Sequence, residues 1–331
     1  MPKKHFVKDL EQFVGMEIED VFLVRDILDK STRDGQEYLE LIIVDLSGSQ
    51  TARIFDNIED VRVKIEKGKI YKLRLSIYQY YGNQLGIKIL DAERVMTYDI
   101  RDFIPSSQRN PQEMFNELKK FINSVKNPYL NELLKRIFLS EKTEKDIEFR
   151  EKFLIAPAAK QNHHDYVGGL LEHTLNVVKA ADLLSEMYNY IDRDLLISGA
   201  LLHDIGKVYE YEFTPDIDFS DIGRLLGHIA IGFEIVNTKI KEMEFMRQFP
   251  EELKMKILHM ILSHHGELVY GSPVRPSFLE AQILHFLDDL DAKAYMYKKA
   301  YDLRSETNKK WSEYLNALKR SVYLGEPEEM E

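Results

Sequence analysis

The sequence predicts a multidomain protein in which an N-terminal all-β barrel precedes an all-α domain. Up to about residue 97, short apolar runs and alternating apolar and polar residues are typical of strands. From residue 151 onward, apolar residues recur at helical spacing, and no convincing strand pattern occurs. Nine of the ten histidines lie between His163 and His285, within this helical part. Such clustering favours a metal site in the helical domain.

The composition limits the functions that the chain can have. Of the 331 residues, 44% are apolar, enough for sizeable cores, and the net charge of −11 restricts any nucleic-acid surface to a local patch. The absence of cysteine excludes disulfides, thiolate metal ligands and cysteine nucleophiles. The start has no apolar signal region, and no apolar run of about 18 residues occurs. We therefore expect a cytoplasmic protein without membrane association.

Residues 1–97 predict five strands and one helix. In 49–55, Ala52 and Ile54 alternate with Thr51 and Arg53. The expected strands are 21–27, 38–45, 49–55, 70–77 and 85–90, with turns at 45–48 and 81–84 and a short helix within 57–67. A helix between the third and fourth of five strands is the order of an OB barrel. The stretch 38–55 resembles the nucleic-acid-binding OB folds that precede catalytic domains in synthetases and nucleases.

A basic and aromatic patch is expected on this barrel. From 61 to 74, six basic residues occur against one acid, Glu66. Single strands bind basic grooves with aromatic platforms, where stacking contributes about 1–3 kcal/mol per base. The alternative is an ordinary solvated lysine face, with the tyrosines in the core or at an edge. The residues expected to contact nucleic acid are Arg53, Phe55, Lys69, Lys72, Arg74, Tyr78, Tyr80 and Tyr81.

The remaining chain predicts a connector, an all-α domain and a tail. Residues 98–150 are expected to connect the domains through helices at 111–125 and 129–138. The all-α domain spans 151–305, with helices expected at 170–178, 191–207, 223–230, 255–263 and 276–301. Residues 306–331 are expected to form a C-terminal helix and an acidic tail.

The segment Leu-Leu-His-Asp-Ile-Gly-Lys at 201–207 places two metal ligands side by side. An imidazole nitrogen and a carboxylate oxygen together suit a divalent cation such as Mn²⁺, Fe²⁺ or Mg²⁺. On a helix, His203 and Lys207 share a face, so a metal ligand and a phosphate-binding ammonium would point into one pocket. An isolated His-Asp pair is more often a partly buried histidine beside a surface acid. The clustering of the other histidines favours the metal interpretation.

The order of His173, His203-Asp204 and Asp288 resembles that of the HD phosphohydrolase superfamily. His228 and His264-His265 resemble the additional ligands of its two-metal members. The combination of an OB fold with Pro-Ala-Ala-Lys-Gln-Asn-His-His-Asp at 157–165, His-Asp-Ile-Gly-Lys at 203–207, Ser-His-His-Gly at 263–266 and Leu-His-Phe-Leu-Asp at 284–288 resembles the YhaM family of 3′→5′ exoribonucleases. This resemblance extends over roughly residues 12–305.

The resemblance implies an HD-type helical fold with two divalent metal ions, Mn²⁺ first and Fe²⁺, Mg²⁺ or Co²⁺ as alternatives. The implied ligands are His173, His203, Asp204, His228, His264, His265 and Asp288, with Asp204 bridging. Asp289 and Asp291 stay alternatives to Asp288 as the ligand. Asp291 could instead hydrogen-bond to a metal ligand and orient it. The expected catalytic residues are Lys207, Asp204, His163 and His164, of which the two histidines could contact phosphate or protonate the leaving oxygen. His259 and His285 are expected to be structural.

Three functions remain open. The first is a metal-dependent 3′→5′ exonuclease that hydrolyses single-stranded RNA, with single-stranded DNA as a further candidate substrate, to nucleoside 5′-monophosphates. Its polarity is implied by the resemblance alone, and a homo-oligomer is expected because a neighbouring protomer could wall off the pocket. The second is an HD phosphodiesterase for a small nucleotide or cyclic dinucleotide, because 263–273 resembles the HD-GYP class. The third is a binding module with a degenerate site, but the sequence keeps every expected ligand.

Overall fold

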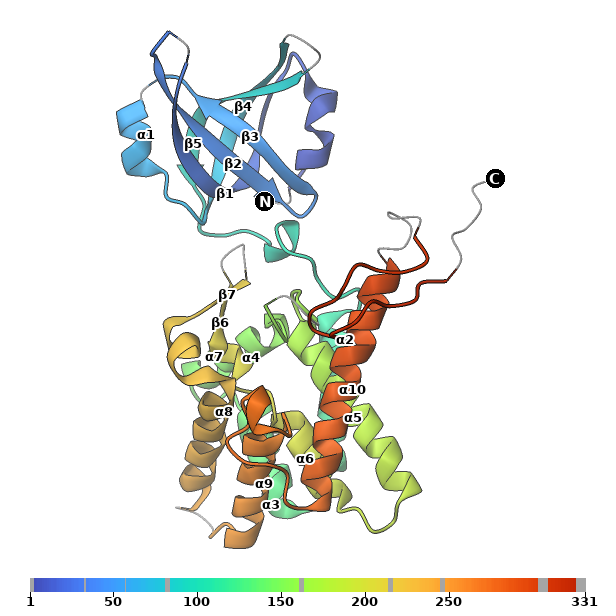
Figure 1. The fold of residues 1–331 in the computed structure, drawn as a ribbon. Helices are drawn as coiled ribbons and strands as arrows, with labels where there is room; N and C mark the ends of the chain where they lie inside the picture. The colour runs from blue at the N-terminus through green and yellow to red at the C-terminus, as the bar shows by residue number, and fades with distance from the viewer. Residues whose placement is uncertain are drawn as a thin grey trace. The chain divides into compact units, whose positions relative to one another are not determined.

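The computed structural model describes residues 3–32, 34–56, 58–80, 84–160, 164–213, 217–244, 248–302 and 309–325. The chain divides into two compact units (Figure 1). One comprises Met1–Ser106 with Phe213–Ile217, and the other comprises Ser107–Glu212 with Asp218–Glu331. Tyr81, His163 and most of the acidic tail, which the sequence analysis singled out, lie outside the described residues.

The first unit is the predicted OB-type barrel. Its strands close in the order β1-β2-β3-β5-β4, and the helix α1 lies between β3 and β4 in the sequence. The elements are β1 (Glu17–Ser31), β2 (Glu37–Asp45), β3 (Gly48–Ile54), α1 (Ile58–Lys64), β4 (Lys69–Tyr80) and β5 (Gln84–Arg94). β3 and β5 pair in parallel at Arg53 and Lys88, and the other neighbouring strands are antiparallel.

Apolar residues that alternate along the strands form the core of the barrel. In β2, Leu39, Leu41 and Ile43 point inward and are buried, while the residues between them are partly exposed. The short helix η1 (Val7–Phe13) adds Val7 and Leu10 to the same core. Register shifts at 24–26 of β1 and 74–75 of β4 let these long strands bend around the barrel.

The second unit is predominantly helical. Its helices are α2 (Pro111–Ser124), α3 (Pro128–Phe138), α4 (Glu144–Ile155), α5 (Gly169–Met187), α6 (Arg193–Leu202), α7 (Lys207–Glu210), α8 (Asp221–Glu244), α9 (Glu251–Ser263) and α10 (Leu279–Asp302). Asn110 and Asn127 cap α2 and α3, and each is followed by a proline in the first turn. Both helices belong to this unit. Within the described ranges, no helix is long and apolar enough to cross a lipid bilayer.

Several elements differ from the sequence prediction. The expected helix 191–207 is instead two helices, because α6 ends at Leu202 and residues 203–206 form a turn. Every residue from 201 to 208 is buried, so apolar spacing could not mark this helix end. A small sheet of β6 (Tyr211–Phe213) and β7 (Ile217–Phe219) was not predicted. The expected C-terminal helix is absent from 309–325, which form an irregular hairpin.

Candidate metal centre and nucleic-acid interface

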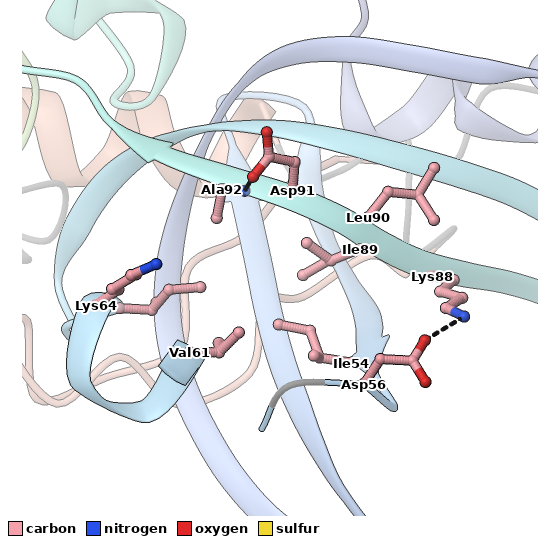
Figure 2. A pocket seen from close by; sticks show the side chains of 10 residues that line it. Ile54, Asp56, Val61, Lys64, Lys88, Ile89, Leu90, Asp91 and Ala92 are labelled. Carbon is pink, nitrogen blue, oxygen red and sulfur yellow. Dashed lines mark hydrogen bonds and ion pairs between the residues drawn. The ribbon is translucent and has the colours of Figure 1, made fainter. Parts of the chain in front are cut away.

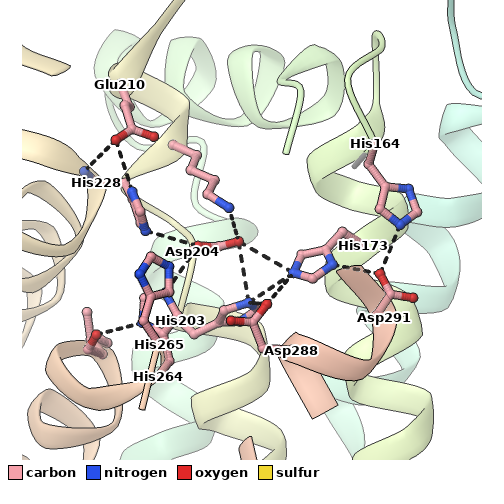
Figure 3. Close-up of polar contacts among 12 residues, drawn as sticks. His164, His173, His203, Asp204, Glu210, His228, His264, His265, Asp288 and Asp291 are labelled. Atoms are coloured by element: carbon pink, nitrogen blue, oxygen red, sulfur yellow. Dashed lines mark hydrogen bonds and ion pairs between the residues drawn. The ribbon is translucent and has the colours of Figure 1, made fainter. Parts of the chain in front are cut away.

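Five segments bring the predicted ligands together in the helical unit (Figure 3). α5 supplies His173, and α10 supplies Asp288. The turn after α6 supplies His203 and Asp204. The other histidines come from α8, which contains His228, and from the end of α9, which is followed by His264-His265.

The first ligand group contains His173, His203, Asp204 and Asp288. The Nε2 atom of His173 lies 3.2 Å from Nε2 of His203 and 3.2 Å from Oδ1 of Asp288. Oδ2 of Asp204 lies 3.4 Å from Nε2 of both histidines. Ligand atoms about 2.1 Å from a tetrahedral metal are roughly 3.4 Å apart, so these atoms could surround one cation.

The second ligand group shares Asp204 and adds His228, His264 and His265. The Oδ1 atom of Asp204 lies 3.5 Å from Nε2 of His228 and 3.4 Å from Nε2 of His264. The two oxygens of one carboxylate therefore face different sets of histidines (Figure 3). This arrangement suits a carboxylate that bridges two cations.

Each histidine of the two groups uses its Nδ1 atom for a hydrogen bond to an acceptor outside the groups. The pairs are His203 with the carbonyl of Ala200 (2.9 Å), His264 with that of Ile261 (2.7 Å), His265 with that of Tyr270 (2.8 Å), His173 with Asp291 (2.7 Å) and His228 with Glu210 (2.9 Å). Because these acceptors occupy Nδ1, Nε2 is the ring atom of each histidine that is left to bind a cation.

Three buried atoms at the centre have no hydrogen-bond partner among the described residues. They are Oδ1 of Asp204, Nε2 of His228 and Nε2 of His264. A buried polar atom without a partner costs about 1–3 kcal/mol, so such atoms are rare. All three belong to the second ligand group, where one cation would satisfy them together. The residues present therefore fit a divalent metal, and their nitrogen and oxygen donors suit Mn²⁺ or Fe²⁺.

Burial and charge oppose each other in setting the pKa values of these ligands. Burial alone would lower the pKa of His173, but contacts with three carboxylates hold it well above its ordinary value. Burial alone would raise the pKa of Asp204, but Lys207 and the nearby histidines hold it well below its usual range. Burial lowers the pKa of His265 to about 4. The His265 imidazole is therefore neutral near pH 7, the form that binds metal.

Lys207 contacts a metal ligand. Its buried Nζ atom donates to Oδ2 of Asp204 at 2.6 Å. The sequence predicts this lysine on the same helix as His203, but Lys207 instead begins α7 after the turn. Gly206 allows that turn to approach α8, because a Cβ atom there would lie 2.0 Å from the carbonyl oxygen of His228. Lys207 also lines a pocket of about 600 Å³ together with His265 and Asp288.

The sequence analysis expected His164 to contact phosphate. In the structure, His164 lies behind the metal ligands. It is buried, and its Nε2 atom lies 2.9 Å from Oδ2 of Asp291, which also accepts from His173. Its Nδ1 atom lies 2.7 Å from the hydroxyl of Tyr166. Both ring nitrogens therefore have partners inside the protein. This geometry suits a residue that positions His173 through Asp291 rather than one that touches substrate.

Of the three neighbouring acids on α10, only Asp288 belongs to a group with the shared ligand Asp204. Asp289 pairs with Lys293 at 2.6 Å. Asp291 accepts hydrogen bonds from His173 and Asn176.

Glu210 was not predicted from the sequence. Its Oε1 atom accepts from both the backbone nitrogen (3.0 Å) and Nδ1 (2.9 Å) of His228. Gly227, with a φ of 72°, interrupts α8 just before His228 and so permits this double contact. Glu210 and His228 are 18 residues apart, so no sequence spacing could indicate the pair.

Replacing Glu210 should weaken metal binding at the second ligand group. Without this acceptor, the orientation and tautomer of His228 are no longer fixed, and we expect Glu210→Ala to lower metal affinity about 10–100-fold. Glu210→Gln should recover part of the affinity because it keeps an acceptor oxygen. Calorimetric titration with Mn²⁺ measures both variants. His259→Gln is the matched control, because Nε2 of His259 accepts from the backbone of Ser277 outside the centre. Wild-type affinity in Glu210→Ala would contradict this role.

The outer face of the barrel brings together four predicted nucleic-acid residues: Arg53, Phe55, Tyr78 and Tyr80. The guanidinium of Arg53 donates to the hydroxyl of Tyr80 at 3.4 Å. The rings of Tyr78 and Tyr80 lie 6.1 Å apart, and Phe55 stacks on Tyr38 at 5.4 Å. The ring of Tyr78 covers Gly86, where a Cβ atom would lie 2.5 Å from it. These contacts form an aromatic surface with one guanidinium.

Other basic residues of the predicted patch lie apart from this aromatic surface. Lys72 lies six residues before Tyr78 on β4, about 20 Å along the strand. It pairs with Glu19 at 2.5 Å. Arg62 pairs with Asp29, and Lys67 pairs with Asp26. Lys69 and Arg74 also precede Tyr78 on β4. Ion pairs therefore neutralise much of the basic run at 61–74.

A smaller pocket of about 230 Å³ opens between α1 and β5 (Figure 2). Its floor is apolar, with Ile54, Val61 and Ile89. At its rim Lys88, the β5 neighbour of Arg53, pairs with Asp56 at 2.8 Å. At the rim, Asp56 therefore neutralises the positive charge of Lys88 beside the aromatic surface.

Comparison with known proteins finds similarity both in sequence and in structure. The HD domain family matches residues 170–293. The 3′-5′ exoribonuclease YhaM of Bacillus subtilis (strain 168) is 31% identical over 291 residues, which cover 87% of this chain and 89% of that protein. Among solved structures, the mitochondrial single-stranded DNA binding protein Rim1 of S. cerevisiae has 13% identity and a TM-score of 0.23 over 25% of this chain and 96% of its own. The second OB-fold domain of replication protein A from Methanococcus maripaludis has 18% identity and a TM-score of 0.21, covering 26% and 90%.

Proposed function

Because this chain belongs to the family of the 3′-5′ exoribonuclease YhaM, we propose that it removes nucleotides from the 3′ end of single-stranded RNA in a reaction that requires two divalent metal ions, with Mn²⁺ as the preferred ion. The chain is a phosphodiester hydrolase with an HD domain. The observation that carries the proposal is the buried carboxylate of Asp204, whose two oxygens face two different sets of histidines.

The residues of the centre would have different chemical roles. His173, His203, Asp204 and Asp288 would hold one ion, and Asp204, His228, His264 and His265 would hold the other. Ions bound there would supply Lewis-acid chemistry, lowering the pKa of a water molecule and neutralising charge on a phosphoryl group. Lys207 positions Asp204 and lines the pocket, where its ammonium would stabilise negative charge on the phosphate oxygens.

The reaction that follows is hydrolysis of the terminal phosphodiester. Water attacks the phosphorus, and the bond to the 3′ oxygen of the penultimate nucleotide breaks. The terminal nucleotide leaves as a nucleoside 5′-monophosphate, and the shortened strand keeps a 3′ hydroxyl. A serine or cysteine nucleophile is not needed.

Product analysis tests this proposal. Uniformly labelled single-stranded RNA, incubated with Mn²⁺ and separated by thin-layer chromatography, should yield nucleoside 5′-monophosphates. Single-stranded DNA in a parallel reaction measures the preference between the two polymers. If a cyclic dinucleotide were hydrolysed and RNA were not, the small-nucleotide phosphodiesterase would replace this proposal.

The aromatic surface of the barrel should contribute to strand affinity. We expect the double variant Arg53→Gln/Tyr80→Ala to bind single-stranded RNA about tenfold more weakly, because it lacks one stacking ring and one phosphate-binding cation. Fluorescence anisotropy in EDTA measures binding without turnover. Lys72→Gln is the matched control, since Lys72 lies about 20 Å along β4 from Tyr78 and so apart from the aromatic surface. Equal affinity of the double variant and the wild type would exclude this surface as the strand-binding face.

A further inference from the structure

The C-terminal segment 309–325 folds beside α10 as an irregular hairpin (Figure 1). Bridges join Trp311 to Tyr323 and Leu315 to Arg320. The rings of Trp311 and Tyr323 lie 5.2 Å apart. One apolar cluster anchors the hairpin to α10: Leu318, Val322 and Leu324 are buried with Ala300. The hairpin is therefore a packed part of the helical unit.

The tip of this hairpin lines the same pocket as the metal ligands. The pocket of about 600 Å³ is lined by Lys207, His265 and Asp288, and also by Lys319 and Arg320. A volume of this size accommodates a nucleotide. Substrate in this pocket would therefore meet both the metal centre and the hairpin tip.

Lys319 and Arg320 bring positive charge to a chain whose net charge is −11. Both are exposed, and no carboxylate among the described residues forms an ion pair with either. Lys293, which also lines the pocket, is by contrast held by Asp289 at 2.6 Å. The two hairpin cations can therefore bind an anion beside the metal centre.

The backbone of Lys319 supports a role for its side chain. Its φ of 51° lies in the left-handed region, which costs a residue with a Cβ atom about 1–2 kcal/mol and which glycine adopts readily. The turn holds it there through hydrogen bonds from the Leu315 nitrogen to the Arg320 carbonyl (3.0 Å) and from the Lys319 nitrogen to the Asn316 carbonyl (3.3 Å). The chain therefore keeps a cation at a position where glycine would relieve the backbone.

We propose that Lys319 and Arg320 bind backbone phosphates of the RNA strand as its end enters the metal centre. This inference rests on the proposed function, because it identifies residues that favour a strand over a single diester. Lysine and arginine both form charge-assisted hydrogen bonds with phosphate oxygens. Tyr270, which is 60% exposed and lines the same pocket, offers a ring on which a base can stack.

Steady-state kinetics on two substrates test the binding of RNA by the hairpin. For a ten-nucleotide RNA, we expect Lys319→Gly to raise KM about fivefold and the double variant Lys319→Gly/Arg320→Gln about tenfold or more, with little change in kcat. The slope of log(kcat/KM) against log salt should become shallower by about 0.7 for each phosphate that the variant no longer binds. A dinucleotide has a single phosphodiester, so its KM should rise less.

The variants separate charge from folding. Glycine relieves the left-handed backbone of residue 319, so Lys319→Gly removes the ammonium without straining the turn. Lys309→Gln is the matched control, because Lys309 lies in the same segment but pairs with Glu313 at 2.6 Å. This control should keep the wild-type KM.

An unchanged KM for RNA in the double variant would overturn the inference, as would equal increases for RNA and dinucleotide. Failure of the wild-type protein to degrade RNA would instead reject the proposed function. In that case anisotropy of labelled RNA in EDTA still tests the hairpin: weaker binding by the double variant supports its role in RNA binding, and equal binding contradicts it.

Discussion

Asp204→Asn should reduce RNA hydrolysis by at least about 1,000-fold, equivalent to about 4 kcal/mol of transition-state stabilisation. Asp204 is the one residue shared by the two ligand groups, and an amide cannot offer two anionic oxygens to two cations. Asparagine keeps the size of the side chain, so the helical unit should remain folded. Turnover of labelled RNA, metal content by mass spectrometry and circular dichroism check these three expectations.

Asp289→Asn is the control for this substitution. Asp289 neighbours Asp288, but it pairs with Lys293 and belongs to none of the ligand groups found among the described residues. We expect this variant to keep its metal content and to stay within a few-fold of wild-type turnover. Full metal content and normal turnover in Asp204→Asn would contradict the bridging role.

Removal of divalent metal should abolish activity completely and lower thermal stability. The orphaned atoms of Asp204, His228 and His264 are buried, and a cation that binds them only in the folded state stabilises that state by mass action. At a free concentration 100 times the dissociation constant, the gain is about 2.7 kcal/mol. Dialysis against EDTA followed by stepwise addition of Mn²⁺ should restore both turnover and melting temperature.

The same titration with Asp204→Asn is the control, since a variant without the shared carboxylate should gain less stability from Mn²⁺. Turnover that survives exhaustive EDTA treatment would show that the centre works without a metal.

Local patterns in the sequence predicted much of the fold. Alternation in β3 and apolar runs elsewhere identified all five barrel strands, although β1 runs from Glu17 to Ser31, well beyond the predicted 21–27. Apolar spacing failed where burial is complete on all sides, as between 201 and 208, because no exposed face then marks a helix end. The hairpin at 309–325 depends on contacts with α10, which a local pattern does not contain.

The candidate site, like the fold, could be predicted only in part from local sequence. Residues with metal-binding chemistry in motifs, such as His203 and Asp204, could be predicted from the side chains themselves, and the structure brings their ligand atoms together. Glu210 and the position of His164 depend on tertiary contacts, with His228 and with Asp291. Three of the six basic residues at 61–74 pair with acids from other segments, which no local pattern indicates.

The most direct test of the central claim compares linear and circular forms of one single-stranded RNA in the presence of Mn²⁺. A 3′→5′ exonuclease should shorten the 5′-labelled linear strand to a ladder, slow down when the 3′ end carries a phosphate, and leave the circle intact. Cleavage of the circle at a rate comparable to that of the linear strand would show an endonuclease and contradict the account.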